Sequence, residues 1–131
     1  MVIGRRTGRT AWGFTLVELL VVLAIVATLL LLSLPRYTQS VVVARERVLA
    51  ENLRTTRDAI DKFYADQHRY PESLDELVDK RYLRGLPMDP VLDSDKAWRI
   101  VPPPTDRQGQ VGDIHSTAEG STLDGKPYVE L

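Results

Sequence analysis

One acidic side chain stands inside a long apolar run and is the first candidate for chemistry. Glu18 is the only charged residue between Phe14 and Leu34, a stretch dominated by leucine, valine, isoleucine and alanine. An ionised carboxylate inside a membrane costs about 2.5–3.5 kcal/mol on insertion scales. This cost predicts a cationic partner for Glu18, because an ion pair neutralises both charges in a low-dielectric setting. The alternative is that Glu18 lies at the membrane surface, where water hydrates its charge.

The two histidines and the lack of cysteine limit the other catalytic and metal-binding chemistry that the chain could perform. His68 and His115 each stand alone, without a nucleophile elbow, a histidine pair at metal-ligating spacing or a phosphate-binding loop. Since the chain has no cysteine, it has no disulfide, thiolate metal site or thiol nucleophile. The sequence therefore predicts a protein that is not an enzyme.

An apolar helix is the element that positions Glu18. The run from Phe14 to Leu34 corresponds to about 31 Å of helix at about 1.5 Å per residue, enough to cross the hydrocarbon core of a bilayer. Three arginines precede it, and cations at this position favour a cytoplasmic N-terminus: Arg5, Arg6 and Arg9. The pattern predicts a single membrane pass that sends the C-terminal part of the chain across the membrane.

The charge balance limits the partners of the remaining chain. Without the three N-terminal arginines, 14 basic residues stand against 18 acidic residues, a net charge of −4. Binding to nucleic acid phosphates requires a basic surface. Nucleic acid is therefore not expected as a principal partner, and only a local basic patch stays open.

The residues from Gly13 to Glu18 read Gly-Phe-Thr-Leu-Val-Glu and form a distinctive junction before the apolar run. An ordinary cleaved signal peptide would have a small-x-small site after the apolar core, and the segment 33–37 has none. The junction closely resembles the leader junction of type IV pilins and type II secretion pseudopilins. This resemblance implies that a prepilin peptidase cuts after Gly13, methylates the new amino group of Phe14 and leaves the apolar segment in the mature protein.

The same resemblance gives roles to Glu18 and Pro35. They become the fifth and twenty-second residues of the predicted mature chain, two positions that match the family. The resemblance implies that Glu18 pairs with the amino group of Phe14 on a neighbouring subunit and sets the register of assembly. Pro35 lacks a backbone N–H, so it either kinks the helix or ends the membrane segment.

Four regions are expected along the chain. Beyond Pro35 apolar and small residues continue at helical spacing, and Pro71 disfavours helix at the residue before it. The expected regions are a cleaved prepilin leader (1–13), a transmembrane and filament-core helix (14–35), an amphipathic stalk helix (36–70) and a small extracytoplasmic head (71–131). The predicted fold class is α+β and pilin-like, with a long N-terminal helix packed on a small C-terminal antiparallel sheet.

Local sequence patterns in the head predict where its helix and strands lie. Ser73 and Glu76 have the spacing of a capping box, which predicts a short helix from about Leu74 to Lys80. Alternating and β-branched residues predict three antiparallel strands, at Lys96–Val101, Val111–Ser116 and Pro127–Leu131.

The stretch from Tyr70 to Pro90 resembles the segment after the stalk helix in the major pseudopilins of type II secretion, the general secretion pathway protein G family. Members bind calcium in the loop between the last strands, which implies Ser116, Glu119 and Asp124 as ligands here. Oxygen donors suit calcium. However, Glu-Gly and Asp-Gly pairs also form ordinary turns, and the longer glycine-rich ending of the family is missing. A plain turn is therefore the alternative.

The resemblance implies a structural pseudopilin of a type II secretion system. A prepilin peptidase, an inner-membrane platform and its cytoplasmic ATPase would assemble it with other pseudopilins into a periplasmic pseudopilus that aids protein export. Its location would be the bacterial inner membrane, with a cytoplasmic N-terminus and a periplasmic head. The alternative function is a minor pilin of a type IV pilus, involved in adhesion or DNA uptake.

Overall fold

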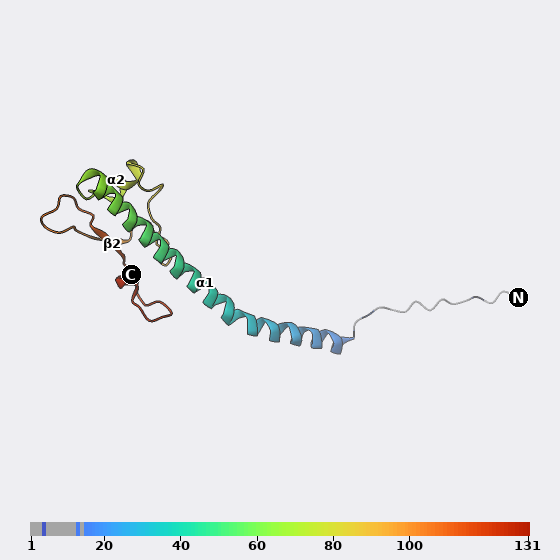
Figure 1. The fold of residues 1–131 in the computed structure, drawn as a ribbon. Helices are drawn as coiled ribbons and strands as arrows, with labels where there is room; N and C mark the ends of the chain where they lie inside the picture. Colours follow the sequence, from blue (N-terminus) through green and yellow to red (C-terminus); the bar gives the residue numbers. More distant parts are fainter. Residues whose placement is uncertain (1–3, 5–12, 14) are drawn as a thin grey trace. The chain divides into compact units, whose positions relative to one another are not determined.

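The computed structural model describes Gly4, Gly13 and residues 15–131. Their elements follow one another along the chain as α1 (Leu16–Gln67), α2 (Leu74–Asp79), β1 (Trp98–Val101), β2 (Asp113–Ser116) and the short 3-10 helix η1 (Tyr128–Glu130) (Figure 1). The chain divides into two compact units, of which the first ends at Thr38 and the second is Gln39–Leu131. A long N-terminal helix with a small antiparallel sheet confirms the predicted α+β, pilin-like fold.

Helix α1 has 52 residues and continues through Pro35. The helix itself therefore does not end at Pro35, while a kink at Pro35 and the end of the membrane segment there stay predictions. A proline removes one backbone donor, and the residues around it keep the helical pattern of bonds. Thr38 adds a local bond, because its hydroxyl donates to the carbonyl of Pro35 at 3.0 Å.

The C-terminal part of α1 forms one wall of the hydrophobic core. Its buried residues recur every three or four positions: Leu49, Leu53, Thr56, Ala59, Ile60 and Phe63. This spacing places them on one face of the helix. The apolar members pack with side chains from the rest of the head, namely Leu74, Leu77, Trp98, Val111, Ile114, Ala118 and Tyr128. The head thus has a single core built against α1.

Helix α2 begins as the sequence predicts. The Ser73 hydroxyl accepts a hydrogen bond from the Glu76 N–H at 3.3 Å. The carboxylate of Glu76 accepts from the Glu72 N–H at 2.7 Å instead of closing the capping box on Ser73. At the other end the Tyr82 N–H donates to the Leu77 carbonyl at 2.8 Å, which completes a Schellman-type C-terminus.

The sheet contains two of the three predicted strands. Strands β1 and β2 pair antiparallel, with Trp98 opposite Ser116 and Val101 opposite Asp113. The prediction of a strand over residues 127–131 is wrong, because most of this segment is η1. Proline at position 127 has no N–H for a ladder, and it forms only an isolated bridge with Ser121. The Tyr128 side chain turns into the core instead.

Candidate assembly site

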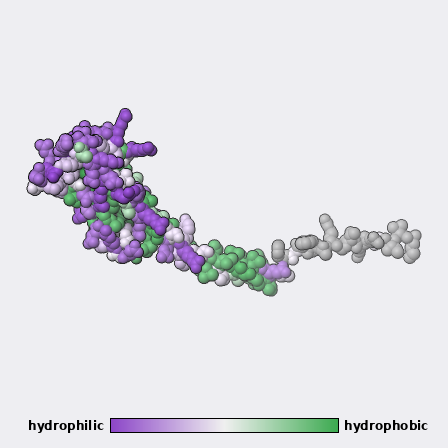
Figure 2. All heavy atoms as spheres, in the orientation of Figure 1, coloured by the Kyte–Doolittle hydropathy of each residue, from purple (hydrophilic) through white to green (hydrophobic). Residues whose placement is uncertain are grey.

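The N-terminal part of α1 presents an uncovered apolar surface. Figure 2 shows it as a stretch of hydrophobic residues, whereas the surface of the head is mixed. Its side chains include Leu20, Leu23, Ile25, Leu29 and Leu32, each more than half exposed. The most apolar 18-residue window of the helix has a mean hydropathy of 2.8, and none of it is buried. By length and composition, this helix fits a single-pass membrane protein.

Glu18 lies in the first turn of α1, where it forms a reciprocal pair of hydrogen bonds with Thr15. The Thr15 hydroxyl accepts from the Glu18 N–H at 3.2 Å. The Glu18 Oε2 atom accepts from the Thr15 N–H, also at 3.2 Å. This is a capping box, which satisfies two backbone donors that the start of a helix leaves without partners.

The capping role of Glu18 was not predicted from the sequence, although the residues around it carry the pattern for it. Thr15 and Glu18 have the Thr-x-x-Glu spacing of a capping box, directly before an apolar run. The bonds place the carboxylate at the positive end of the helix dipole, where a negative charge is stabilised. A carboxylate has room for several donors, so the cap leaves capacity for a second, cationic partner.

The predicted cleavage site is only partly within the described residues. Gly13 is exposed, and a Cβ atom added to it would meet no other atom within 4 Å. Phe14 lies outside the described residues. Cleavage after Gly13, methylation of Phe14 and its pairing with Glu18 therefore stay predictions.

Of the three predicted calcium ligands, Ser116 takes up another contact in the structure. Ser116 is fully buried, and its hydroxyl donates to the Asp89 carboxylate at 2.6 Å. Glu119 and Asp124 are exposed. No group of three or more histidine, aspartate or glutamate side chains that could hold a metal occurs in the part of the chain that the structure describes. The three residues do not fit a ready-made calcium cage, and calcium binding stays a prediction.

The buried carboxylate of Asp89 was not anticipated from the sequence. Besides the Ser116 hydroxyl, it accepts the N–H groups of Val91 at 2.9 Å and Leu92 at 3.2 Å. These bonds satisfy both carboxylate oxygens and fix the loop before β1 to the end of β2. The Asp89-Pro90 pair reads as a simple turn, and nothing in its spacing indicates a partner in β2.

The two histidines occupy structural positions. His68 follows the last residue of α1, is exposed and has a left-handed backbone with φ of 55°. The His115 Nδ1 atom lies 2.8 Å from the Leu131 carbonyl oxygen, and its Nε2 atom lies 3.4 Å from the Asp113 carboxylate. His115 therefore ties β2 to the segment that follows η1.

The fold and the N-terminal helix together define a class. An exposed apolar helix that continues as one wall of a small α+β head is the pilin-like arrangement.

The comparisons agree with this class. The chain is 34% identical over 71 residues to competence protein ComGC from Halalkalibacterium halodurans, a match that covers 54% of this chain and 70% of ComGC. No family model and no solved structure matches the chain. At this identity and coverage, the chain belongs to the family of type IV pilin-like proteins that includes ComGC.

Proposed function

We propose that this chain is a structural subunit of a membrane-rooted filament. A prepilin peptidase would remove the leader after Gly13 and methylate Phe14, and the apolar part of α1 would then pack with its counterparts in other copies. The subunit itself would perform no catalysis. An inner-membrane platform driven by a cytoplasmic ATPase would add subunits from the membrane.

The observation that carries the proposal is the position of Glu18 and its hydrogen bonds to Thr15. It is a single carboxylate in an exposed apolar segment, and it is held at the helix start by Thr15. The cap orients the carboxylate toward the backbone N–H of Thr15, the residue that follows the predicted new N-terminus in the sequence. A neighbouring amino group would neutralise this charge, and an unpaired copy would keep the cost of an uncompensated charge in lipid.

Substitutions at Glu18 can separate its charge from its capping role. Glu18→Gln retains a side chain that can close a capping box but removes the negative charge, whereas Thr15→Ala weakens the cap and keeps the charge. We expect Glu18→Gln to insert and to be processed normally, but to enter filaments at least about tenfold less, a change that corresponds to about 1.4 kcal/mol. Thr15→Ala should lower incorporation less.

Quantitative blotting of membrane and sheared-filament fractions would measure this split. Normal incorporation of Glu18→Gln would contradict the proposed charge pair. Loss of incorporation in Thr15→Ala alone would assign the effect to the helix cap.

Competence is the first candidate for the machinery that uses this filament, since the relative is a competence protein. The mature chain predicted here has a net charge of −4, which does not favour broad contact with DNA phosphates. We therefore propose that the subunit contributes to DNA uptake as a building block of the filament. This differs from the minor-pilin alternative, in which a head loop would bind the ligand.

Protein secretion is the second candidate, favoured by the resemblance of Tyr70–Pro90 to type II secretion pseudopilins. In the structure this segment contains α2 and the loop that packs on α1 through Tyr82 and Leu83. Deletion in the native host would separate the two roles. Loss of transformation with an unchanged secreted proteome supports competence, and the opposite result supports secretion. Complementation by wild type but not by Glu18→Gln would link either loss to assembly.

A further inference from the structure

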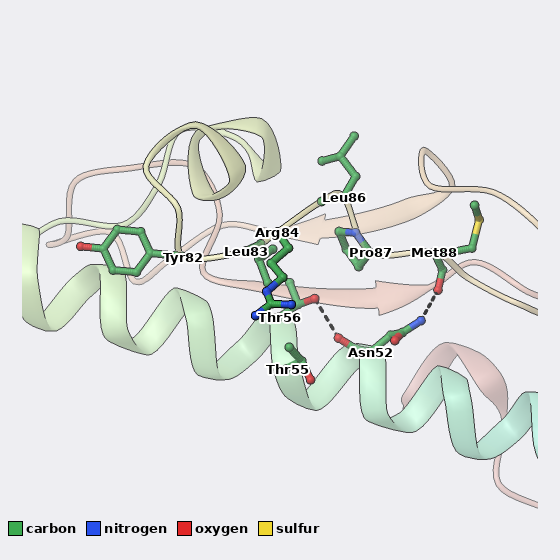
Figure 3. A pocket seen from close by; sticks show the side chains of 10 residues that line it. Asn52, Thr55, Thr56, Tyr82, Leu83, Arg84, Leu86, Pro87 and Met88 are labelled. Atoms are coloured by element: carbon green, nitrogen blue, oxygen red, sulfur yellow. Dashed lines mark hydrogen bonds between the residues drawn. The ribbon is translucent and has the colours of Figure 1, made fainter.

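Two grooves flank the loop that follows α2. The first has a volume of about 570 Å³ and lies between α1 and the loop, lined by Asn52, Thr55, Thr56 and residues 82–88. Figure 3 shows the Arg84 side chain directed from the loop toward α1, and Leu86 directed away from the helix. The loop therefore presents a cationic side chain on the side that faces α1 and an apolar side chain on the opposite side.

Three cations gather at this loop within five positions. Lys80, Arg81 and Arg84 are all exposed. Within the described residues, Arg81 and Arg84 form no ion pair. Arg81 also has a left-handed backbone, with φ of 64°, at the position after the helix cap where glycine is the less strained residue. We call residues Lys80–Gly85 the basic loop.

The second groove is lined mainly by acidic charges, opposite in sign to those of the basic loop. Its volume is about 560 Å³, and apolar side chains form much of its wall, including Leu74, Leu86, Trp98, Ile100 and Val111. Three carboxylates, Glu72, Asp75 and Asp95, and one ammonium group, Lys96, also line it. Ile100 is 41% exposed there. We call this surface the acidic groove.

We propose that the basic loop of one copy docks in the acidic groove of a second copy. This inference rests on the proposed filament, since it names the head surfaces through which subunits meet. Arg81 and Arg84 would pair with Asp75 and Asp95 of the neighbour. The aliphatic part of each arginine would lie on the apolar wall around Ile100, as long cationic side chains do on apolar surfaces.

The charge pattern favours a second copy over another partner. The chain carries an excess of acidic residues outside its predicted leader, so a second copy offers carboxylates to Arg81 and Arg84, which form no ion pair among the described residues of their own subunit. The basic loop and acidic groove are different surfaces of one head, so their contact is heterologous. Repeated heterologous contacts that do not close a ring build an open helical assembly, which is the geometry that a filament requires.

Engineered cysteines test the contact directly, because the chain has none of its own. The full chain would carry Arg84→Cys together with Asp75→Cys, and filaments assembled in cells would be oxidised and separated on a non-reducing gel. We expect a ladder of covalent multimers. The control pairs Arg84→Cys with Asp124→Cys, an exposed residue of another loop, and should give no ladder. Filaments that contain the first pair without forming a ladder would overturn the docking contact.

Charge reversal supplies an independent measurement. Arg81→Glu with Arg84→Glu would place like charges together, and we expect filament incorporation to fall at least about tenfold. Adding Asp75→Arg and Asp95→Arg should restore incorporation to within about threefold of wild type, since the pairing is then reversed. Lys126→Glu, on another exposed loop, is the matched control and should leave incorporation unchanged.

The outcomes separate this inference from the proposed function. Wild-type chains that are processed but form no filament would contradict the proposed function itself. Normal filaments from the reversed loop would overturn the docking surface alone. A reversed loop that assembles normally but loses salt-dependent binding of short duplex DNA would show that the basic loop takes a polyanion instead of a second copy.

Discussion

The two parts of α1 meet different surroundings although they belong to one helix. Before Thr38 its large apolar side chains are exposed within the described chain, as in Leu23 at 56%. In the second compact unit its apolar face is covered by the head, and Phe63 is 0% exposed. Both parts are therefore helical, but they are stabilised differently. Burial in the head stabilises one part, and we expect lipid or other copies to cover the apolar side chains of the other part.

The largest expected effect comes from removing a core side chain in the covered part. Phe63→Ala should destabilise the head by about 3–5 kcal/mol, because it removes apolar contacts and leaves a cavity. The matched change in the uncovered part, Leu23→Ala, should leave the unfolding of the head unchanged. Denaturant unfolding of the full chain in detergent, followed by tryptophan fluorescence, would measure both. Equal losses of stability would contradict the distinction between the two parts.

Arg57 tests how the covered part of α1 holds distant segments of the head. Its guanidinium bonds the Asp113 carboxylate at 2.7 Å, the Ile114 carbonyl at 2.9 Å and the Leu131 carbonyl at 2.8 Å. Since its side chain is 36% exposed, we discount these bonds for screening and expect Arg57→Ala to cost about 1–2 kcal/mol.

The control for Arg57 is an ion pair on the outer face of the same helix. Arg54 pairs with Glu51, and both side chains are more than half exposed. Arg54→Ala should leave the free energy of unfolding nearly unchanged, because water screens this exposed ion pair. A similar cost for both variants would show that the contacts of Arg57 to β2 and to Leu131 add little.

The pair between Arg69 and Glu76 predicts how the head responds to acid. The hydrogen bond from the Arg69 guanidinium lowers the pKa of the Glu76 carboxyl, against an opposing effect of burial. A lowered folded-state pKa means that this contribution to stability is full above the unfolded value of about 4.3 and is lost as the pH falls through the folded value. Glu76→Gln should therefore reduce the loss of stability in acid.

Unfolding midpoints between about pH 7 and about pH 3 would measure this linkage. Glu119→Gln, an exposed change elsewhere in the head, should retain the acid dependence of wild type. If Glu76→Gln also retained it, the carboxyl would not be a source of the acid response.

The smallest expected effect lies at the end of α1. His68 has φ of 55°, and its N–H donates to the Tyr64 carbonyl at 2.9 Å, so it occupies the left-handed position of a helix C-terminus. His68→Gly should stabilise the head by about 0.5–1 kcal/mol, because glycine adopts this conformation without strain. His68→Ala keeps the Cβ atom and should give no comparable gain in the unfolding midpoint. Equal gains would assign the effect to the imidazole ring.

Local signals account for what could be predicted from the sequence. The apolar run and the spacing of buried residues predicted α1, and Ser73 marked the start of α2. The Thr15–Glu18 cap has an equally local signal that was overlooked. The third strand failed because Pro127 removes a donor and Tyr128 finds space in the core, a choice made by packing.

The contacts that could not be predicted join residues far apart in the chain. Asp89 meets Ser116 across 27 positions, and Arg57 meets the Leu131 carbonyl across 74 positions. Each residue has an ordinary local role, in a turn or on an exposed helix face, and the pairing appears only when the core closes. The same limit applies to the basic loop and the acidic groove, whose apposition depends on a second copy.

The central claim is that α1 remains in a processed, filament-forming subunit. Expression of the full chain with its prepilin peptidase, followed by intact-mass and terminal-peptide mass spectrometry, tests it most directly. We predict a mature chain that begins with N-methylated Phe14 and keeps Glu18 as its fifth residue. An intact Met1 terminus, or cleavage beyond Leu34, would contradict the claim.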